Sequence, residues 1–228
     1  MKTILTALAM TLAAGPALAA GPALADDAAM DRALLGYQEH WARINYTLPA
    51  DQKAAAFETL AKQEDALVKS YPNRAEPLVW QGIILSSLAG AERSLGALGL
   101  AKQARADLLA SEKIDPAALH GSAEASLGTL YYRVPGWPIG FGDDDKAEVH
   151  FKNALQIDPD GIDTNYLYAD FLYGKHRYPE AMQALKKAWA APARPDRPLA
   201  DKGRRQEIAA LMAKVKEKAG GSLKAAEL

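Results

Sequence analysis

The residue types that usually carry catalysis are sparse in this chain. Its four histidines, at positions 40, 120, 150 and 176, occur singly, and the sequence has no cysteine. Zinc sites and nucleophilic active sites need several groups at defined spacings, such as two histidines four residues apart on a helix. A Gly-x-Ser-x-Gly elbow and a phosphate-binding loop are also missing from the sequence. We therefore expect a protein that is not an enzyme and uses no cofactor.

Three consecutive aspartates, Asp143 to Asp145, are the feature that most suggests a metal. Hard cations bind carboxylate oxygens, but the ligand spacing of a calcium-binding loop is absent here. Neighbouring positions on a helix also point in different directions. The sequence favours a simpler role, in which Asp143 caps a helix and the next two residues interact with the positive end of its dipole. We expect no metal site.

A segment rich in glycine and proline contains the first group of candidate binding residues. Residues 133–142 read Arg-Val-Pro-Gly-Trp-Pro-Ile-Gly-Phe-Gly, directly after two tyrosines. Prolines stiffen the backbone and glycines permit tight turns, so this loop is suited to hold aromatic side chains in place. These side chains either form the wall of a ligand site or fold back over the end of the helices. The candidate residues are Tyr132, Arg133, Trp137 and Phe141.

A second group of candidates is spaced at steps of three, four and three, which places its members on one face of a helix. They are Asp163, Tyr166, Asp170 and Tyr173. If this face lines a groove, the groove is acidic and aromatic there and suits a polar or cationic ligand, or a partner helix. The alternative is that the tyrosines pack against neighbouring helices.

The elements that position these candidates are predicted to be helices. Three segments of the chain share one helical pattern. In each segment a small residue is followed by a larger apolar residue four positions on, a small residue seven on, and a proline eleven or twelve on. The segments are Ala104, Leu108, Ser111 and Pro116; Ala147, Phe151, Ala154 and Pro159; and Ala181, Leu185, Ala188 and Pro192. Offsets of four and seven share one helix face, and proline ends the helix. This pattern is typical of the second helix of a tetratricopeptide (TPR) repeat.

The preceding helix of each repeat should supply a small residue where the two helices cross. Gly82 and Ala169 lie ten residues after the proline that closes the previous repeat, and Gly128 lies twelve after it. Two repeats are about ten residues longer than the usual TPR length of roughly 34. We place much of this excess in loops at residues 90–100 and 133–142, since insertions in repeat proteins project as loops.

The predicted fold class is all-α. We expect a TPR-like, right-handed superhelix of antiparallel helix pairs, with about three to four repeats and a capping helix. The first pair is atypical and covers residues 31–46 and 51–70, with Asp51 as the cap of its second helix. The capping helix covers about residues 201–218 and ends at a glycine pair. The domain boundaries are then 26–219 for the helical domain and 220–228 for a disordered tail.

The first 25 residues predict export. Lys2 precedes a short apolar run, and two Ala-Leu-Ala boxes follow it. This combination is typical of a secretory signal peptide, with cleavage after Ala25 or, alternatively, after Ala19. Export of a cysteine-free helical protein indicates the bacterial periplasm, with helix packing as the source of stability. The net charge of −1 gives no reason to expect nucleic acid as a partner.

Part of the chain, residues 127–192, resembles more than a general TPR. A Val-Pro-Gly-Trp-Pro loop at 134–138, followed by a Phe-Gly-Asp helix start at 141–143, is similar to the TatT-like family, the T component of tripartite ATP-independent periplasmic (TRAP) transporters. The resemblance implies an envelope-associated helical protein with a ligand-sized channel, which can form a trimer and associate with a periplasmic solute-binding subunit. Members are typically lipoproteins, whereas this chain has no lipid-accepting cysteine.

Two functions are open at the level of the sequence. The first is a periplasmic TPR binding or scaffold protein, an accessory component of a TRAP-type uptake system that binds a small organic ligand or the solute-binding subunit. The alternative is a general cell-envelope scaffold that holds a helix or peptide of a protein partner and has no small-molecule ligand.

Overall fold

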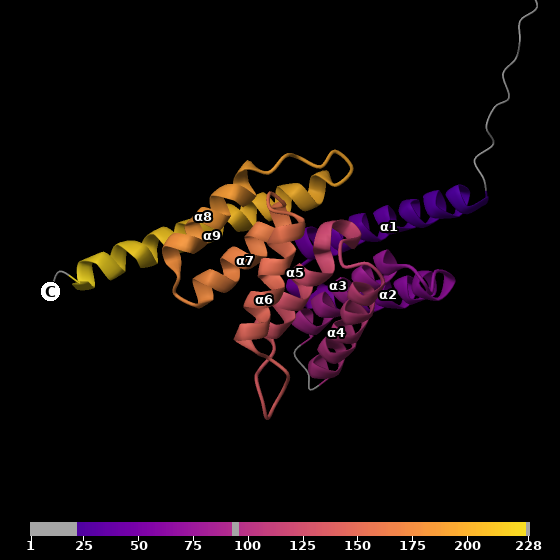
Figure 1. Ribbon diagram of the computed structural model, residues 1–228, viewed down its shortest axis with the longest axis horizontal. Coiled ribbons are helices and arrows are strands. Elements are labelled where there is room, and N and C mark those ends of the chain that lie inside the picture. Colours follow the sequence, from indigo (N-terminus) through magenta and orange to yellow (C-terminus); the bar gives the residue numbers. More distant parts are fainter. Residues whose placement is uncertain (1–21, 93–95, 227–228) are drawn as a thin grey trace, which may run out of the picture.

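Consecutive helices pack in pairs along the chain. The computed structural model describes residues 22–92 and 96–226, and within these ranges it contains nine helices (Figure 1). The helices are α1 (Pro22–Thr47), α2 (Ala50–Ser70), α3 (Ala75–Ala91), α4 (Ala97–Ile114), α5 (Ala118–Arg133), α6 (Asp144–Ile157), α7 (Ile162–Gly174), α8 (Tyr178–Ala190) and α9 (Pro198–Ala226). The first eight form four helix pairs, and α9 packs on α8. The predicted all-α, TPR-like fold is confirmed.

The pattern of small and large residues lies where the helices of a pair cross. Leu108, Phe151 and Leu185 are 0% exposed, and burial of each contributes about 2 kcal/mol. A Cβ added to Gly82 would collide with Leu108, and one added to Gly128 would lie 2.9 Å from Phe151 Cδ1. The missing side chains therefore let α3 approach α4 and α5 approach α6, as the TPR spacing predicts.

A kink at the start of α5 accounts for the later position of its crossing glycine. Leu119, His120 and Gly121 have left-handed backbones, with φ values of 48°, 57° and 70°. Regular helix begins only after them, so the kink takes up the additional residues between Pro116 and the crossing point. Gly121 is buried at the kink, where an added Cβ would lie 3.0 Å from Ile157 Cδ1.

The two long repeats differ in where their additional residues go. Residues 90–100 were expected to form a loop, but α3 continues to Ala91 and α4 begins at Ala97. That expectation is wrong for the described residues, because most of the excess lengthens two helices. Residues 134–143 form a loop between α5 and α6, as predicted. Asp143 caps α6 by accepting a hydrogen bond from the backbone N–H of Lys146 at 3.1 Å.

Several helix ends differ from the sequence prediction. Asp51 lies in the first turn of α2 and does not cap it; its charge favours the positive end of the helix dipole instead. α1 already begins at Pro22, upstream of the predicted start at residue 31. α9 continues to Ala226, past the glycine pair at 220–221, since glycine weakens a helix without forcing it to end.

The helices do not test the signal peptide predicted at the N-terminus or settle the disordered tail predicted at the C-terminus. Residues 1–21, most of the predicted signal peptide, lie outside the described residues, so export stays a prediction. The predicted disordered tail, 220–228, overlaps the end of α9, and its last two residues lie outside the described part of the chain. None of the described helices is both long enough and apolar enough to cross a membrane.

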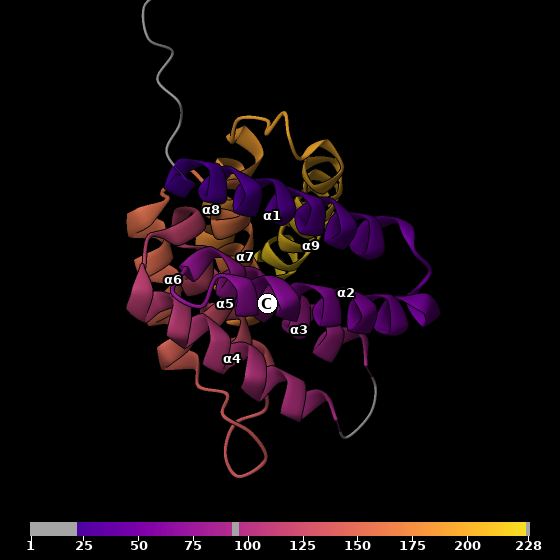
Figure 2. The same ribbon diagram turned by 90° about the vertical axis from the view of Figure 1, so that its right-hand side faces the viewer.

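Five inner helices form a ring. α1, α3, α5, α7 and α9 each pack against the next, and α9 packs in turn against α1. Figure 2 shows α1 beside α9, and Figure 1 shows the two helices extending from opposite ends of the molecule. Tyr46 of α1 lies against Gly203 of α9, and its hydroxyl donates to Glu207 Oε2 at 3.2 Å. The concave face is therefore closed by the last helix.

Candidate binding site

A cavity of about 190 Å³ lies inside the ring, and all five inner helices line it. Its apolar wall is formed by Trp41, Trp80, Ile83, Ala125, Leu167 and Ala200. Its polar groups are Tyr46, Ser86, Ser87, Ser122, Ser126, Thr129, Asp163, Thr164, Arg197 and Arg204. The rings of Trp41 and Trp80 meet edge-on with their centroids 6.1 Å apart. A cavity of this size can hold several water molecules or a small organic molecule.

Most hydroxyl groups of the cavity already donate their proton within the protein. Ser86, Ser122 and Thr129 donate to carbonyl oxygens of their own helices at 2.7, 2.6 and 2.9 Å. Ser87 donates in the same way at 2.8 Å and accepts from Trp41 Nε1, also at 2.8 Å. The oxygens of Ser86, Ser122 and Thr129 can still accept a hydrogen bond from a ligand, but these groups have no proton left to donate.

Asp163 is the acidic residue of the cavity, and arginines surround it. Arg204 Nε and Arg194 Nη1 donate to its two oxygens, each at 2.7 Å. Burial alone would raise the pKa of Asp163, but the charges of Arg204 and Arg194 outweigh that effect and hold this pKa well below its usual range. Arg204 also pairs with Glu207, and Arg194 with Asp201, each at 2.7 Å. This network therefore joins two arginines to three carboxylates.

Arg197 is the charged group of the cavity that this network does not satisfy. Its guanidinium carbon lies 5.5 Å from the ring centroid of Trp80, and its Nε has no hydrogen-bond partner among the described residues. Burial lowers the pKa of Arg197, but arginine remains protonated at neutral pH. The charges of Asp163 and Asp201 act on Arg197 without a hydrogen bond to its Nε, so this N–H is free to donate to a further acceptor.

The predicted stripe on α7 does not act as one surface. Asp163 lines the cavity, whereas Tyr166 packs under Arg204, with 4.4 Å between the guanidinium carbon and the ring centroid. Burial, together with the charge of Glu207, raises the pKa of Tyr166 to about 12. Tyr173 packs against Tyr178 with ring centroids 5.8 Å apart. For these two tyrosines the packing alternative describes the structure.

A second cluster joins the ends of α5 and α7. Arg133 forms an ion pair with Asp170 and lies over the ring of Tyr132, 4.9 Å from its centroid. Tyr132 in turn packs edge-on against Phe171 at 5.4 Å and touches Gly174. Both aspartates of the stripe are thus paired with arginines, so the acidic character predicted for this face is not found.

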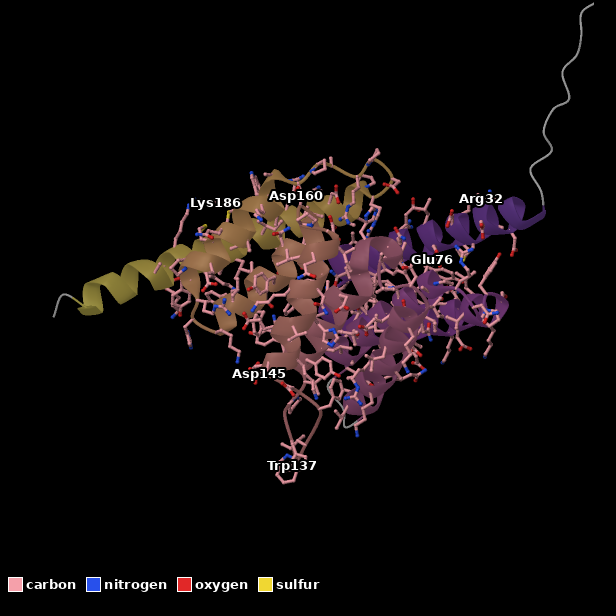
Figure 3. All side chains as sticks on the ribbon, in the orientation of Figure 1. Arg32, Glu76, Trp137, Asp145, Asp160 and Lys186 are labelled. Atoms are coloured by element: carbon pink, nitrogen blue, oxygen red, sulfur yellow. The ribbon has the colours of Figure 1, made fainter. Side chains whose placement is uncertain are left out.

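The loop after α5 lies away from the cavity. Phe141 packs edge-on against Tyr131 at 5.7 Å, and Arg105 of α4 lies 4.0 Å from its ring centroid. Trp137 is 90% exposed and points away from the body of the molecule (Figure 3). Backbone hydrogen bonds close the loop, among them Gly142 N–H to the Pro135 oxygen at 2.9 Å. Phe141 covers the helices, whereas Trp137 is left free for a contact outside the molecule.

Sequence reasoning missed the tryptophans and arginines that give the cavity its character. Trp41 and Trp80 belong to the first two repeats, whereas Arg197 directly precedes α9 and Arg204 lies on it, more than a hundred residues later. No local spacing links them, because ring closure by α9 brings them together. The run of four arginines between 194 and 205 was the available signal.

The helices form a TPR-like repeat fold with an internal cavity. Residues 139–215 match the family model of the tetratricopeptide repeat. A similar solved structure is that of a thermophilic TPR protein from Thermus thermophilus, with 18% sequence identity and a TM-score of 0.54. That similarity covers 84% of this chain and 94% of the other, and it shows the fold alone. No curated protein sequence matches this chain.

Proposed function

We propose that this protein is an exported TPR-fold binding protein whose internal cavity holds a small organic anion. The observation that carries the proposal is Arg197, which faces the cavity beside Trp80 with its Nε unpartnered. A carboxylate there would neutralise the guanidinium in a charge-assisted hydrogen bond. The TPR fold and the predicted signal peptide favour a binding or scaffold role in the periplasm over a catalytic one.

The chemistry of the wall narrows the class of ligand. Around Arg197 the cavity offers two indole rings and aliphatic side chains. Most of its serine hydroxyls donate their protons to the backbone, so toward a ligand they act as hydrogen-bond acceptors. The ligand that fits has one acidic group, an apolar or ring-shaped body, and hydroxyl or amine groups that donate to the wall. A strongly cationic ligand does not suit the cavity, because Asp163 is already paired with two arginines.

Within this proposal, the resemblance to the TRAP T component suggests the context. A protein that holds an organic acid in the periplasm could serve a TRAP-type uptake system and pass the ligand to or from its solute-binding subunit. A trimer, as the resemblance implies, would place three such cavities in one assembly. The cavity inside the ring supports a ligand-binding accessory role over that of a scaffold without a small-molecule ligand.

Native mass spectrometry of protein purified from the periplasm tests the proposal. We expect a small organic acid to co-purify with the wild type and to be lost in Arg197→Gln and Trp80→Ala. Trp189→Ala is the control, since Trp189 is half-exposed on α8 and does not line the cavity. A wild type without any bound small molecule, or one whose bound molecule survives Arg197→Gln, would contradict the proposal.

A protein-binding role is the second candidate, and the exposure of Trp137 favours it. A tryptophan that is 90% exposed on a hydrogen-bonded loop is a ready anchor for an apolar pocket on a partner. A photoreactive amino acid placed at position 137 should then cross-link to one envelope protein in vivo, and one placed at Trp189 should not. Equal cross-linking from both positions would remove this candidate.

A further inference from the structure

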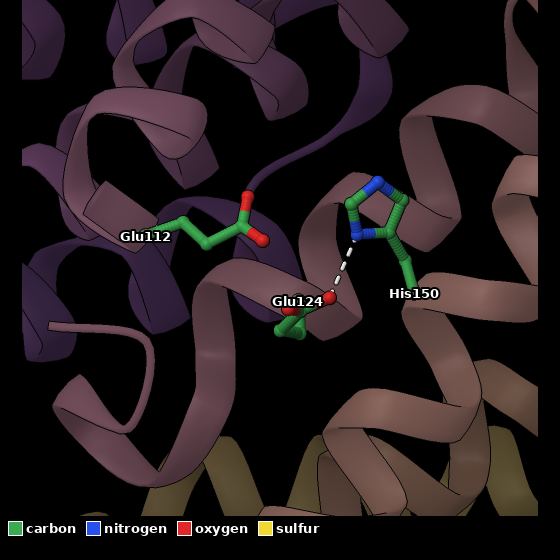
Figure 4. Close-up of side chains that lie close together, drawn as sticks. All are labelled: Glu112, Glu124 and His150. Atoms are coloured by element: carbon green, nitrogen blue, oxygen red, sulfur yellow. Dashed lines mark hydrogen bonds and ion pairs between the residues drawn. The ribbon is translucent and has the colours of Figure 1, made fainter.

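Two carboxylates and one imidazole converge outside the ring, at the junction of three helices. Glu112 comes from α4, Glu124 from α5 and His150 from α6 (Figure 4). One ligand atom from each side chain lies within 4.8 Å of the other two, and His150 Nδ1 is 2.7 Å from Glu124 Oε2. None of the three residues lines the cavity described above.

The charges at this junction are not balanced by the protein. Glu124 is 3% exposed, and among the described residues no lysine or arginine forms an ion pair with it. This differs from Asp163, whose carboxylate meets two arginines. The amide of Asn153 approaches both oxygens of Glu124 only at 3.4 Å. Glu124 is thus poorly solvated and has the imidazole of His150 as its close partner, with the half-buried Glu112 nearby.

Glu112 lies beside this pair, with a carboxylate oxygen within 4.8 Å of the ligand atoms of Glu124 and His150. A divalent cation between the three groups would compensate both negative charges at once.

We propose that Glu112, Glu124 and His150 bind a zinc ion. One imidazole nitrogen and two carboxylate oxygens are ligands that Zn²⁺ accepts, whereas Ca²⁺ and Mg²⁺ prefer oxygen ligands alone. With zinc–ligand bonds of roughly 2.0–2.2 Å, the ligand atoms of a tetrahedral site lie about 3.3–3.6 Å apart. Binding therefore requires side-chain adjustments, because His150 Nδ1 and Glu124 Oε2 are 2.7 Å apart and the three ligand atoms lie within 4.8 Å of one another.

The surroundings hold the imidazole in place for such a role. The ring of His150 stacks on Tyr131, with centroids 5.3 Å apart and an angle of 7° between the planes. Three protein ligands leave one position of a tetrahedral zinc ion for water. The ion would tie α4, α5 and α6 together, so its binding should raise the melting temperature of the protein.

Zinc binding to the purified, chelator-treated protein tests the proposal. Competition with a chromophoric zinc chelator at about pH 7.5 should give one zinc ion per chain. Glu124→Gln and His150→Gln should each weaken binding at least tenfold and abolish the rise in melting temperature. The controls are Glu39→Gln and His40→Gln, an exposed carboxylate and an exposed imidazole on α1, which should leave zinc affinity unchanged.

The outcomes separate a built site from surface binding and from misfolding. Should Glu124→Gln fail to fold by circular dichroism, Glu112→Gln replaces it, since Glu112 is less buried. Absence of saturable binding to the wild type would overturn the proposal. Equal zinc affinity of the wild type and of His150→Gln would overturn it too, because the ion would then bind elsewhere on the chain.

Discussion

At the scale of single residues, buried carboxylates decide how the stability of this protein depends on pH. Glu64 of α2 is 0% exposed, and neither of its carboxylate oxygens has a hydrogen-bond partner among the described residues. Burial, followed by the charges of Asp65 and Asp107, raises the pKa of Glu64 to about 8. Burial and Asp65 likewise raise the pKa of Asp107 to about 6. Glu64 is therefore protonated in the folded protein at neutral pH.

Glu64→Gln should remove a large part of this pH dependence. Because the pKa of Glu64 is higher in the folded than in the unfolded chain, the free energy of unfolding falls as the pH rises from about 4.5 to about 8. Glutamine keeps the shape and does not titrate. We expect urea unfolding to show a gain of about 4 kcal/mol at pH 8 and of less than about 1 kcal/mol at pH 5.

The control for this experiment is Glu58→Gln, on the same helix. Glu58 is exposed, and the hydrogen bond and charge of Lys62 lower its pKa, so its removal should leave the fall in stability between pH 5 and pH 8 in place. A wild type whose stability stays constant between pH 5 and pH 8 would refute the account of Glu64.

Two aspartates of the predicted stripe should differ in their importance for stability. Asp163→Asn removes the carboxylate that pairs with Arg204, whose side chain is only 12% exposed, and we expect a loss of about 2 kcal/mol. Asp170→Asn breaks an ion pair with Arg133, which is 57% exposed, and should cost less than about 1 kcal/mol. Chemical denaturation measures both, and equal losses would contradict the assignment of Asp163 to the buried network.

At the scale of helices, local periodicity was predictable and connections between distant helices were not. The distance from the closing proline of the previous repeat identified Gly82 and Gly128 as crossing residues, because the two helices of a pair are close in sequence. It was harder to predict whether the additional residues at 90–100 extend the helices or form a loop, since both α3 and α4 tolerate glycine near their ends. The partnership of Arg197 with Trp80 depends on ring closure, which no local pattern encodes.

The kink of α5 gives a prediction at this scale. Gly121→Ala places a Cβ on a left-handed backbone and against Ile157, and should lower the free energy of unfolding by about 1–2 kcal/mol. His120→Gly relieves the same backbone conformation at an exposed position and should raise it by up to about 1 kcal/mol. Thermal unfolding distinguishes the two, and changes of the same sign would mean that the kink is not strained.

At the scale of the whole molecule, closure of the ring depends on the contact between α1 and α9. Gly203 lies so close to the ring of Tyr46 that any side chain would collide with it. Gly203→Ala should therefore cost about 1–3 kcal/mol and displace α9 from α1. Gly36→Ala is the matched control, because nothing lies within 4 Å of its Cβ position, and it should stabilise α1 slightly. Equal stability of the two variants in a thermal melt would argue against a closed ring.

The central claim is that this ring encloses a site for a small organic anion. The most direct test is a crystal structure of the protein purified from its native cells without a refolding step. We predict electron density for an organic acid in the cavity, with its carboxylate on the Arg197 guanidinium and its body against Trp80. A cavity filled only by ordered water, with Arg197 turned to a carboxylate of the protein itself, would contradict the claim.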